Sequence, residues 1–265
     1  MIPAPTPALT GLSVLVTRPA DSGASLCRKI VALGGEAIAL PAIVIEGLKE
    51  PVVVSTDPSP GPHTYDVVIF VSPNAVAHGL NAIARTPDTP IAAIGKSTAA
   101  ALTAAGAAPA IVPEAGFTSE ALLAHPGLQA DTLRRVLIVR GGTGREVLEE
   151  TLVARGIEVD YLEVYRRVPA DIDAAARTKL LARWRDGGID VVTATSGEIL
   201  HNLHRMLGAD GQTLLATTPL LVVSPRLADA ARALGCVGEV LVAPAADDDA
   251  IAGVLALWRT RARTQ

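Results

Sequence analysis

The sequence predicts a two-lobed α/β protein whose parallel sheets are flanked by helices, and three observations indicate this fold class. A segment near the N-terminus, 14–43, recurs without a gap as 136–165. Short apolar runs rich in Val and Ile alternate with longer helical patterns. Nearly every run ends on a hydroxyl, glycine or cationic residue. Strands and helices that alternate in this way form parallel sheets with helices on both faces.

The first repeated unit has the order strand, turn, helix, glycine and second strand in both copies. The helix of the second copy is expected over about 145–155, because its apolar positions recur on one face of a 3.6-residue period. Gly34 and Gly156 stand where a glycine commonly ends a helix. Glu149 and the neighbouring Glu150 are expected on a solvated face of this helix.

A second unit is also present twice. The runs Asp66–Ser72 and Asp190–Ser196 are continuous and rich in β-branched residues. Such runs predict buried parallel strands that lead into helices. Ser72 and Ser196 are suited to cap those helices, and Pro73 suits a first helical position.

A third unit recurs less clearly, at 91–106 and 220–235, with shared alanines and a final glycine. Each copy continues into a short strand, and a capped helix is expected to start near Thr118 and near Asp247. The chain order is therefore three units followed by the same three units again, which predicts two similar lobes.

Two divisions of the chain into lobes fit this order. One is a cut near residue 130. The other is an exchanged division, because Glu36–Gly47 and Glu158–Val168 predict strands about twice the usual length that can leave one lobe and enter the other side by side. Lobe 1 would then contain 1–40 and 170–265, and lobe 2 would contain 41–169. The periodicity of the apolar residues fits both divisions.

Composition and charge exclude several classes of protein. The formal net charge is -4, whereas a general nucleic-acid surface needs a basic domain. The apolar runs are far shorter than the roughly 20 residues of a membrane span. Residues 1–10 lack the features of a signal peptide and are expected to form a disordered tail. Cys27 and Cys236 have no metal or redox spacing, so free thiols in a cytoplasmic protein are expected.

The strand ends predict the binding site, because ligands of open parallel sheets bind outside the carboxyl ends of the strands. Each of these ends precedes a helix whose free N–H groups and dipole favour an anion. Capping alone explains any single Ser or Thr, but four cationic residues add charge that caps do not need. We expect the ends to face one cleft and to bind a polyanionic small molecule through Thr17, Arg18, Ser72, Asn74, Lys96, Ser97, Thr98, Arg140, Gly141, Thr195, Ser196, Gly197 and Arg226.

Other constellations predict little chemistry. The glycine-rich loop 141–144 matches neither a dinucleotide fingerprint nor a P-loop. His201 and His204 have no third ligand nearby in the pattern, so no metal site is expected. Asp247–Asp249 is interpreted as an acidic first helical turn that matches the dipole. No nucleophile–base order or carboxylate pair stands out.

Several segments together resemble the uroporphyrinogen-III synthase family. Each motif is weak alone, but their order and spacing are specific, and the resemblance covers about residues 12–258. It rests on Val14–Pro19, Phe70–Val76, Ala93–Ala99, Val139–Gly141, Leu162–Arg167 and Thr195–Ser196. The segment Ser224–Ala228 departs from the family, which more often has glycine and a hydroxyl pair there.

The resemblance implies two flavodoxin-like lobes joined by a two-stranded β-ribbon, which favours the exchanged division. It implies a linear tetrapyrrole substrate, hydroxymethylbilane, which the enzyme closes into a ring with inversion of the last pyrrole and loss of water. No cofactor is implied. Tyr165 matches a ribbon tyrosine that is thought to help the hydroxyl leave. The alternative role of Tyr165 is that of an amphipathic residue on a half-buried ribbon.

Two other functions share the predicted cleft. One is a non-catalytic binding or sensor protein for an anionic small molecule. The other is a phosphosugar or nucleotide enzyme that uses the 141–144 loop, against which the lack of a matched general base counts. A monomer is expected in each case, since nothing in the sequence requires an oligomer.

Overall fold

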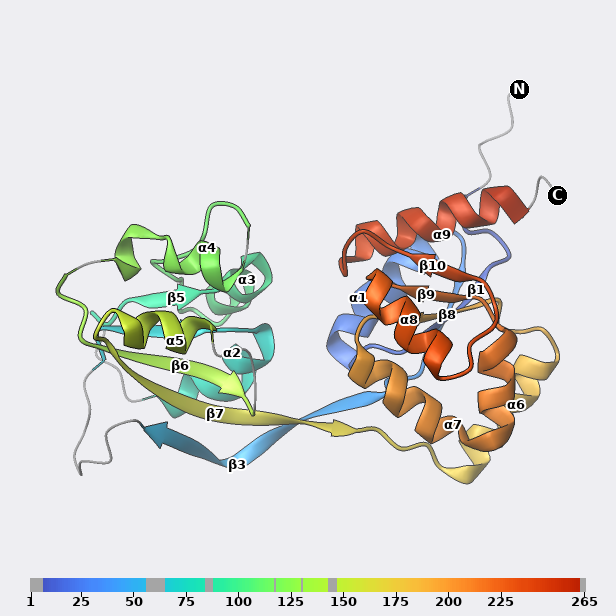
Figure 1. Ribbon diagram of the computed structural model, residues 1–265, viewed down its shortest axis with the longest axis horizontal. Coiled ribbons are helices and arrows are strands. Elements are labelled where there is room, and N and C mark those ends of the chain that lie inside the picture. The colour runs from blue at the N-terminus through green and yellow to red at the C-terminus, as the bar shows by residue number, and fades with distance from the viewer. Residues whose placement is uncertain are drawn as a thin grey trace, which may run out of the picture. The chain divides into compact units, whose positions relative to one another are not determined.

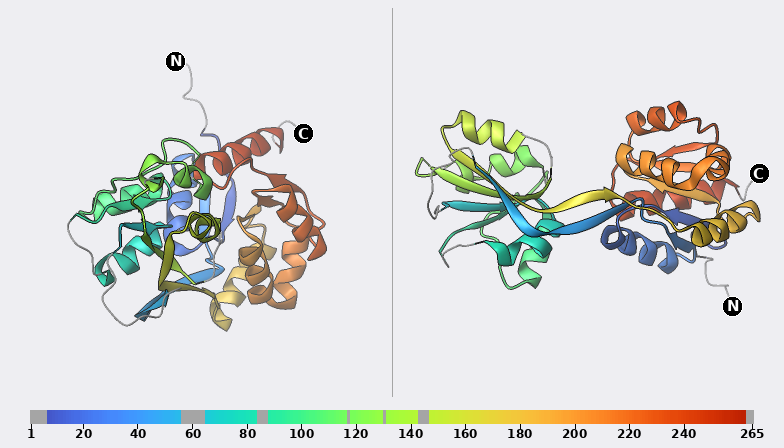
Figure 2. Two further views of the ribbon diagram at one scale, coloured as in Figure 1. Left: turned by 60° about the vertical axis from the view of Figure 1, so that its left-hand side comes forward. Right: turned by 90° about the horizontal axis from the view of Figure 1, so that it is seen from below.

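The computed structural model describes residues 7–55, 65–83, 88–116, 118–129, 131–142 and 147–262. The chain divides into two compact units, which we name lobe 1 (Met1–Val44 with Val168–Gln265) and lobe 2 (Ile45–Arg167). Each lobe contains one five-stranded sheet with helices on both faces (Figures 1 and 2). In the described part of the chain, no helix is both long and apolar enough to cross a membrane.

The sheet of lobe 1 has the strand order β10-β9-β8-β1-β2, and every neighbouring pair is parallel. With the strands renumbered within the lobe, this is the flavodoxin-like order 2-1-3-4-5. The elements are β1 (Ser13–Val16), α1 (Ala20–Ala32), β2 (Glu36–Ala39), α6 (Ala174–Arg185), β8 (Val191–Ala194), α7 (Gly197–Thr217), β9 (Leu220–Val222), α8 (Pro225–Ala233), β10 (Val240–Val242) and α9 (Asp248–Ala262).

The sheet of lobe 2 has the order β3-β7-β6-β4-β5. Four consecutive strands, β7-β6-β4-β5, are parallel and repeat the order found in lobe 1. The elements are β3 (Ile43–Ser55), β4 (Val67–Phe70), α2 (Pro73–Gly79), the 3₁₀ turn Leu80–Ala82, β5 (Ile91–Ala93), α3 (Lys96–Ala104), α4 (Ser119–Leu123), the 3₁₀ turn Pro126–Leu128, β6 (Arg135–Gly141), α5 (Val147–Ala154) and β7 (Glu158–Pro169).

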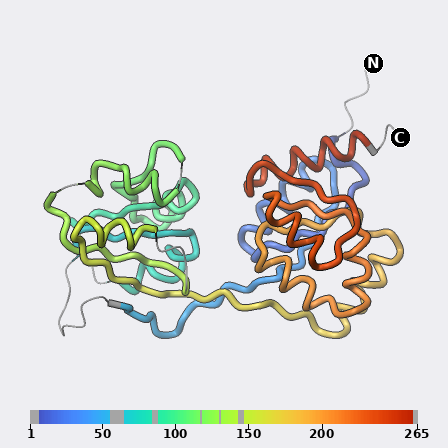
Figure 3. Tube along the Cα trace, in the orientation of Figure 1, coloured from blue at the N-terminus to red at the C-terminus, as the bar shows by residue number. Residues whose placement is uncertain are grey.

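Two neighbouring strands carry the chain between the lobes. β3 leads from lobe 1 into lobe 2 and β7 leads back, so they run in opposite directions (Figures 1 and 3). At their lobe 1 end, the Ala170 N–H donates to the Ala42 carbonyl at 3.1 Å. The predicted fold class, two flavodoxin-like α/β lobes joined by two strands, is confirmed.

The prediction of one long strand over 36–47 is wrong. β2 ends at Ala39, residues 40–42 belong to neither strand, and β3 begins at Ile43. The Leu40 and Ala42 N–H groups donate to the consecutive carbonyls of Val16 and Thr17, so the pairing shifts at Pro41, whose ring fixes φ at about -65°. The corresponding strand of the second copy, β7, continues without a break to Pro169.

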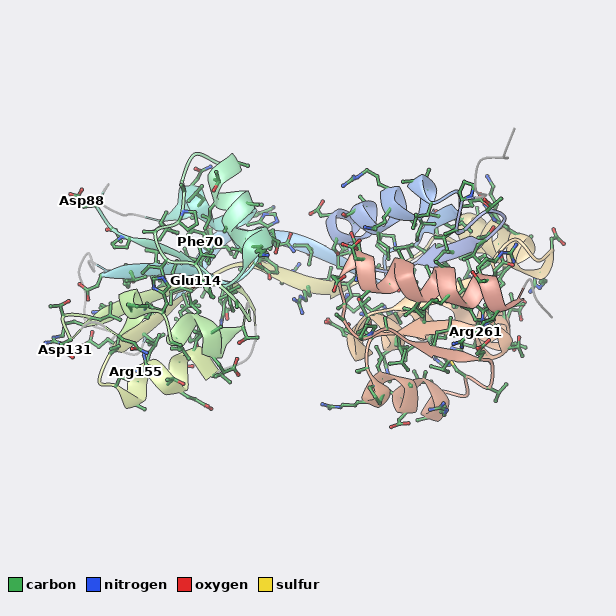
Figure 4. All side chains as sticks on the ribbon, turned by 90° about the horizontal axis from the view of Figure 1, so that it is seen from above. Phe70, Asp88, Glu114, Asp131, Arg155 and Arg261 are labelled. Carbon is green, nitrogen blue, oxygen red and sulfur yellow. The ribbon has the colours of Figure 1, made fainter. Side chains whose placement is uncertain are left out.

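Alternation along the strands assigns side chains to the two faces of each sheet. In lobe 2, Val67 and Ile69 pack in the cluster that includes α4 and α5. Val68 and Phe70 pack in the cluster that includes α2 and α3, and Figure 4 labels Phe70 within this lobe. In lobe 1, α1 and α9 cover one face.

The local signals of the repeats are confirmed. Gly34 and Gly156 end their helices with φ values of 82° and 77°. The Ser72 and Ser196 hydroxyls accept hydrogen bonds from the N–H groups of Ala75 and Ile199. The predicted helix start at residue 145 lies outside the described residues, and α5 is described from Val147.

Candidate active site

Each lobe has a topological switch point, where the strand order reverses, and open α/β sheets bind ligands outside the carboxyl ends of the strands at such a point. In lobe 1 the switch lies between β1 and β8, and in lobe 2 it lies between β6 and β4. Of the residues predicted to bind substrate, Thr17, Arg18, Thr195, Ser196 and Gly197 lie at the first switch point. Ser72, Asn74, Arg140 and Gly141 lie at the second, and the end of β5 carries Lys96, Ser97 and Thr98.

Tyr165 lies within β7, at the last residue that pairs with β6, on the face of lobe 2 that α2 and α3 cover. The residue is 4% exposed. Its hydroxyl is 3.1 Å from the Ser72 Oγ, which also accepts a hydrogen bond from the Ala75 N–H at 3.0 Å. The phenol is therefore joined to the first turn of α2.

Gly141 lies directly against the ring of Tyr165. A Cβ atom at this position would be 2.4 Å from the tyrosine Cε2 and 2.6 Å from its Cζ. The register of β6 and β7 shifts between Arg140 and Gly141, and the Gly142 N–H donates to the Tyr165 carbonyl at 3.0 Å. Both the irregular pairing and the missing side chain make room for the ring.

Arg140 is held on the other face of the same sheet. Its guanidinium lies 3.5 Å from the centroid of the Tyr161 ring, and one nitrogen is 3.2 Å from the Glu163 Oε1. Tyr161 belongs to the cluster of α4 and α5, and its hydroxyl donates to Glu149 at 2.7 Å. The prediction that Glu149 lies on a solvated helix face is therefore wrong, because the residue is half-buried and binds Tyr161.

The remaining predicted residues of lobe 2 lie in the first turns of two helices. Lys96 and Ser97 are exposed at the start of α3, whereas Thr98 is buried. The N-cap of α3 is Gly95, which has no side chain to cap the helix. Asn74 is half-buried in the first turn of α2. These two helix starts have the N–H groups and dipole that favour an anion.

In lobe 1, Arg18 has partners that the sequence did not reveal. The guanidinium donates to Asp248 Oδ1 at 2.6 Å and to the Ala246 carbonyl, and the side chain is 8% exposed. Arg18 therefore joins the end of β1 to the start of α9. The acidic run 247–249 has this second role besides matching the helix dipole.

The other residues of lobe 1 that were predicted to bind substrate lie at strand ends and in the first turns of helices. Thr17 is buried, and its hydroxyl donates to the Thr193 carbonyl, which links β1 with β8. Thr195 and Ser196 are half-buried, and Gly197 is exposed in the first turn of α7. Arg226 is exposed in the first turn of α8, which Ser224 caps.

Three residues that contact the predicted cations were not identified from the sequence. Tyr161 and Glu163 contact Arg140, and Asp248 contacts Arg18. Glu163 lies inside the Leu162–Arg167 motif, and Asp248 lies inside an acidic run, but neither context indicates an arginine partner. Alternation does place Tyr161 on the same strand face as Glu163. Which arginine they meet depends on strand pairing.

The described residues were also compared with the side-chain groupings that bind metals or carry thiol chemistry. Among the residues that the structure describes, no three His, Cys, Asp or Glu side chains gather to hold a metal ion. Cys27 and Cys236 are free thiols, and burial raises the pKa of both. The helix starts at the strand ends have N–H groups suited to binding an anion, and the Tyr165 hydroxyl lies beside one of them.

Known proteins resemble this chain over most of its length. A family model described as "Uroporphyrinogen-III synthase HemD" matches residues 24–253. The uroporphyrinogen-III synthase of Salmonella typhimurium is 37% identical over 247 residues, covering 91% of this chain and 98% of the relative. The Escherichia coli protein of the same name is 35% identical over 249 residues, covering 91% and 98%.

Solved structures share the fold at lower sequence identity. The uroporphyrinogen-III synthetase of Helicobacter pylori has a TM-score of 0.54 at 15% identity and covers 93% of this chain and 98% of its own. A mutant uroporphyrinogen III synthase of Thermus thermophilus has a TM-score of 0.52 at 18% identity and covers 96% and 100%. The extent of the family model and the identity to the bacterial relatives show that this chain belongs to the uroporphyrinogen-III synthase family.

Proposed function

We propose that the protein cyclises hydroxymethylbilane to uroporphyrinogen III, with inversion of the last pyrrole ring and loss of water. Membership of the family supports this activity. The observation that carries it within the structure is the contact of the Tyr165 hydroxyl with Ser72 at 3.1 Å. This contact lies at the carboxyl ends of the parallel strands, beside the start of α2, and supports Tyr165 as the proton donor of the reaction.

The strand ends of both lobes are suited to the carboxylates of this substrate. Helix starts supply N–H donors, and Lys96 and Arg226 are exposed cations in the first turns of α3 and α8. Such groups bind anions through charge-assisted hydrogen bonds. That both sets of strand ends face one cleft depends on the arrangement of the lobes and stays a prediction.

The proposed reaction needs little from the protein besides shape and one proton. The C–O bond of the hydroxymethyl group breaks, the pyrrole nitrogen supplies the electron pair, and Tyr165 gives its proton to the departing oxygen. Attack through a spiro intermediate closes the ring, and the proton released as the ring regains aromaticity restores the phenol. Holding the reacting carbons together contributes about 7–11 kcal/mol to such reactions.

The product isomer tests this proposal. The protein is supplied with hydroxymethylbilane, and the products are oxidised and separated. The type III isomer is the expected result. Only the type I isomer, which forms spontaneously, would contradict the proposal and leave the alternative of a binding or sensor protein.

Unchanged activity after dialysis against a chelator is expected from the proposed absence of a cofactor. Size-exclusion chromatography tests the proposed monomer.

Replacement of Tyr165 by Phe tests the proton donor. We expect Tyr165→Phe to lower kcat about 100-fold, because general acid catalysis commonly contributes at least that much. The ring is kept, so the free energy of unfolding should fall by only about 1 kcal/mol, the value of one hydrogen bond. Tyr65→Phe is the matched control, since it removes a phenolic hydroxyl of the same lobe that bonds to Asp160 instead. A Tyr165→Phe variant with wild-type kcat would remove the catalytic role.

A further inference from the structure

We infer that Ser72 and Gly141 are positioning residues for Tyr165, and that Ser72 donates its hydrogen to the phenolic oxygen. The inference rests on the proposed function, because it assigns two residues to the proton donor of that reaction. It also changes the role expected of both, which the sequence placed among the residues that bind substrate.

The position of the Tyr165 ring depends on the absence of a side chain at Gly141. A Cβ atom there would lie 2.4, 2.6 and 2.9 Å from Cε2, Cζ and Cδ2 of the tyrosine. Real Cβ contacts are not found at such distances. A ring that lies on the backbone of residue 141 has its plane fixed by that backbone, and any larger residue displaces it.

The backbone around Gly141 fixes the other end of the tyrosine. Gly141 pairs with Tyr165 after a register shift, whereas Arg140 pairs with Glu163. The Gly142 N–H then donates to the Tyr165 carbonyl at 3.0 Å. A bulge of this kind re-aims a side chain at the end of a strand. Here it turns Tyr165 towards the same face as Val164 and the start of α2.

The direction of the Ser72–Tyr165 hydrogen bond determines whether the tyrosine hydrogen is available to substrate. A serine hydroxyl has one hydrogen and two acceptor sites. One acceptor site of Ser72 is taken by the Ala75 N–H at 3.0 Å, and its hydrogen or its second acceptor site meets the Tyr165 oxygen at 3.1 Å. The proposed reaction needs the tyrosine hydrogen for the departing hydroxyl, so we assign the donor role to Ser72. In this direction the tyrosine hydrogen is free for the departing hydroxyl. The same Ser72 hydrogen then stabilises the phenolate until its proton returns.

A double-mutant cycle tests whether Ser72 acts through Tyr165. We expect Ser72→Ala to lower kcat about 10-fold in the wild type and less than about 2-fold in the Tyr165→Phe background, because coupled residues are not additive. Ser72→Thr keeps the hydroxyl and should restore most of kcat. An equal loss of kcat in both backgrounds, or a rise in KM alone, would overturn the positioning role.

Thr118→Ala is the matched control for the lost helix cap. Thr118 caps α4 in the same lobe by accepting from the Ala121 N–H at 3.2 Å. Both variants remove one cap of a short helix, and Ser72→Ala also removes the hydrogen bond to Tyr165. Only Ser72→Ala should lower kcat. If Thr118→Ala lowers kcat as much, the effect of Ser72→Ala reflects stability and the inference fails.

A spectroscopic arm separates this inference from the proposed function. The chain has three tyrosines, so NMR of protein with labelled tyrosine rings resolves Tyr165 by comparison with Tyr165→Phe. We expect Ser72→Ala and Gly141→Ala to shift the Tyr165 ring signals and Thr118→Ala to leave them in place. Unmoved signals in both variants would overturn the inference even if the type III isomer forms. A protein that makes only type I isomer with shifted signals would overturn the proposed function alone.

Gly141→Ala also has a kinetic readout. We expect kcat to fall at least 10-fold, because the ring must leave its place. Wild-type kcat and unchanged ring signals would overturn the role of Gly141. If Gly141→Ala fails to fold, the Ser72 cycle remains as the test. Gly142→Ala is the control, because a Cβ at Gly142 meets no atom within 4 Å and should leave the Tyr165 ring signals unchanged.

Discussion

Asp160 is a fully buried carboxylate with partners on two sides. It is 0% exposed, and its Oδ2 accepts from the Arg135 Nε at 2.9 Å and from the Tyr65 hydroxyl at 3.1 Å. A buried charge is tolerated when it is paired and hydrogen-bonded. Burial and the negative charge of Asp160 raise the pKa of Tyr65 from 10.0 to about 12.

The raised pKa of Tyr65 predicts a loss of stability at high pH. The folded protein holds this proton more tightly than the unfolded chain, so the contribution is complete below pH 10 and is lost as the pH rises towards 12. Between pH 9 and 11, urea unfolding of the wild type should lose about 1 kcal/mol more than that of Tyr65→Phe, after allowance for solvent screening of the phenol. Parallel pH dependences of the two proteins would contradict this.

At the scale of single elements, α7 contains a kink at Gly208. The φ and ψ angles there are 67° and 178°, although helical residues lie on both sides. This backbone conformation is essentially restricted to glycine. The glycine therefore lets α7 change direction while Leu203 and Leu215, on either side of it, both stay buried.

Alanine at Gly208 and at Gly253 should have opposite effects. Gly208→Ala forces a side chain into the positive-φ conformation and should lower the free energy of unfolding by about 1–3 kcal/mol. Gly253 is an exposed helical residue of α9 with open space around it, so Gly253→Ala should raise it by about 0.5–1 kcal/mol. Urea unfolding measures both. A neutral Gly208→Ala would show that α7 straightens without cost.

At the scale of the whole molecule, each lobe has its own hydrophobic core. Leu26 belongs to a buried cluster made only of lobe 1 residues, and Leu152 belongs to one made only of lobe 2 residues. The tryptophan and tyrosine side chains, whose spectra report unfolding, are divided between the lobes in the same way. Both tryptophans, Trp184 and Trp258, lie in lobe 1, whereas all three tyrosines lie in lobe 2.

Core truncations should therefore change one probe at a time. Leu26→Ala and Leu152→Ala each remove a side chain that is 0% exposed and should cost about 2–5 kcal/mol in their own lobe. Leu26→Ala should move the tryptophan fluorescence transition in urea, and Leu152→Ala should leave it in place. Near-ultraviolet absorbance of tyrosine should respond in the opposite way. If each variant moves both probes together, the lobes unfold as one cooperative unit.

The repeats, helix starts and helix ends could be predicted from the sequence because their physical causes are local. A serine before a helix bonds to an N–H three residues later, as Ser72 and Ser196 do. A glycine in the left-handed conformation ends a helix within one turn, as Gly34 does. The duplicated order of these signals predicted two α/β lobes without knowledge of any contact between distant residues.

The partners of the site residues were decided by tertiary structure alone. Arg18 meets Asp248 across 230 residues of sequence, and Ser72 meets Tyr165 across 93. Periodicity indicates which face a side chain is on, but a contact also depends on strand order and register, which bring distant segments together. The break at Pro41 and the register shift at Gly141 are small local events. The effect of the shift at Gly141 on the site follows from its pairing with Tyr165 of β7.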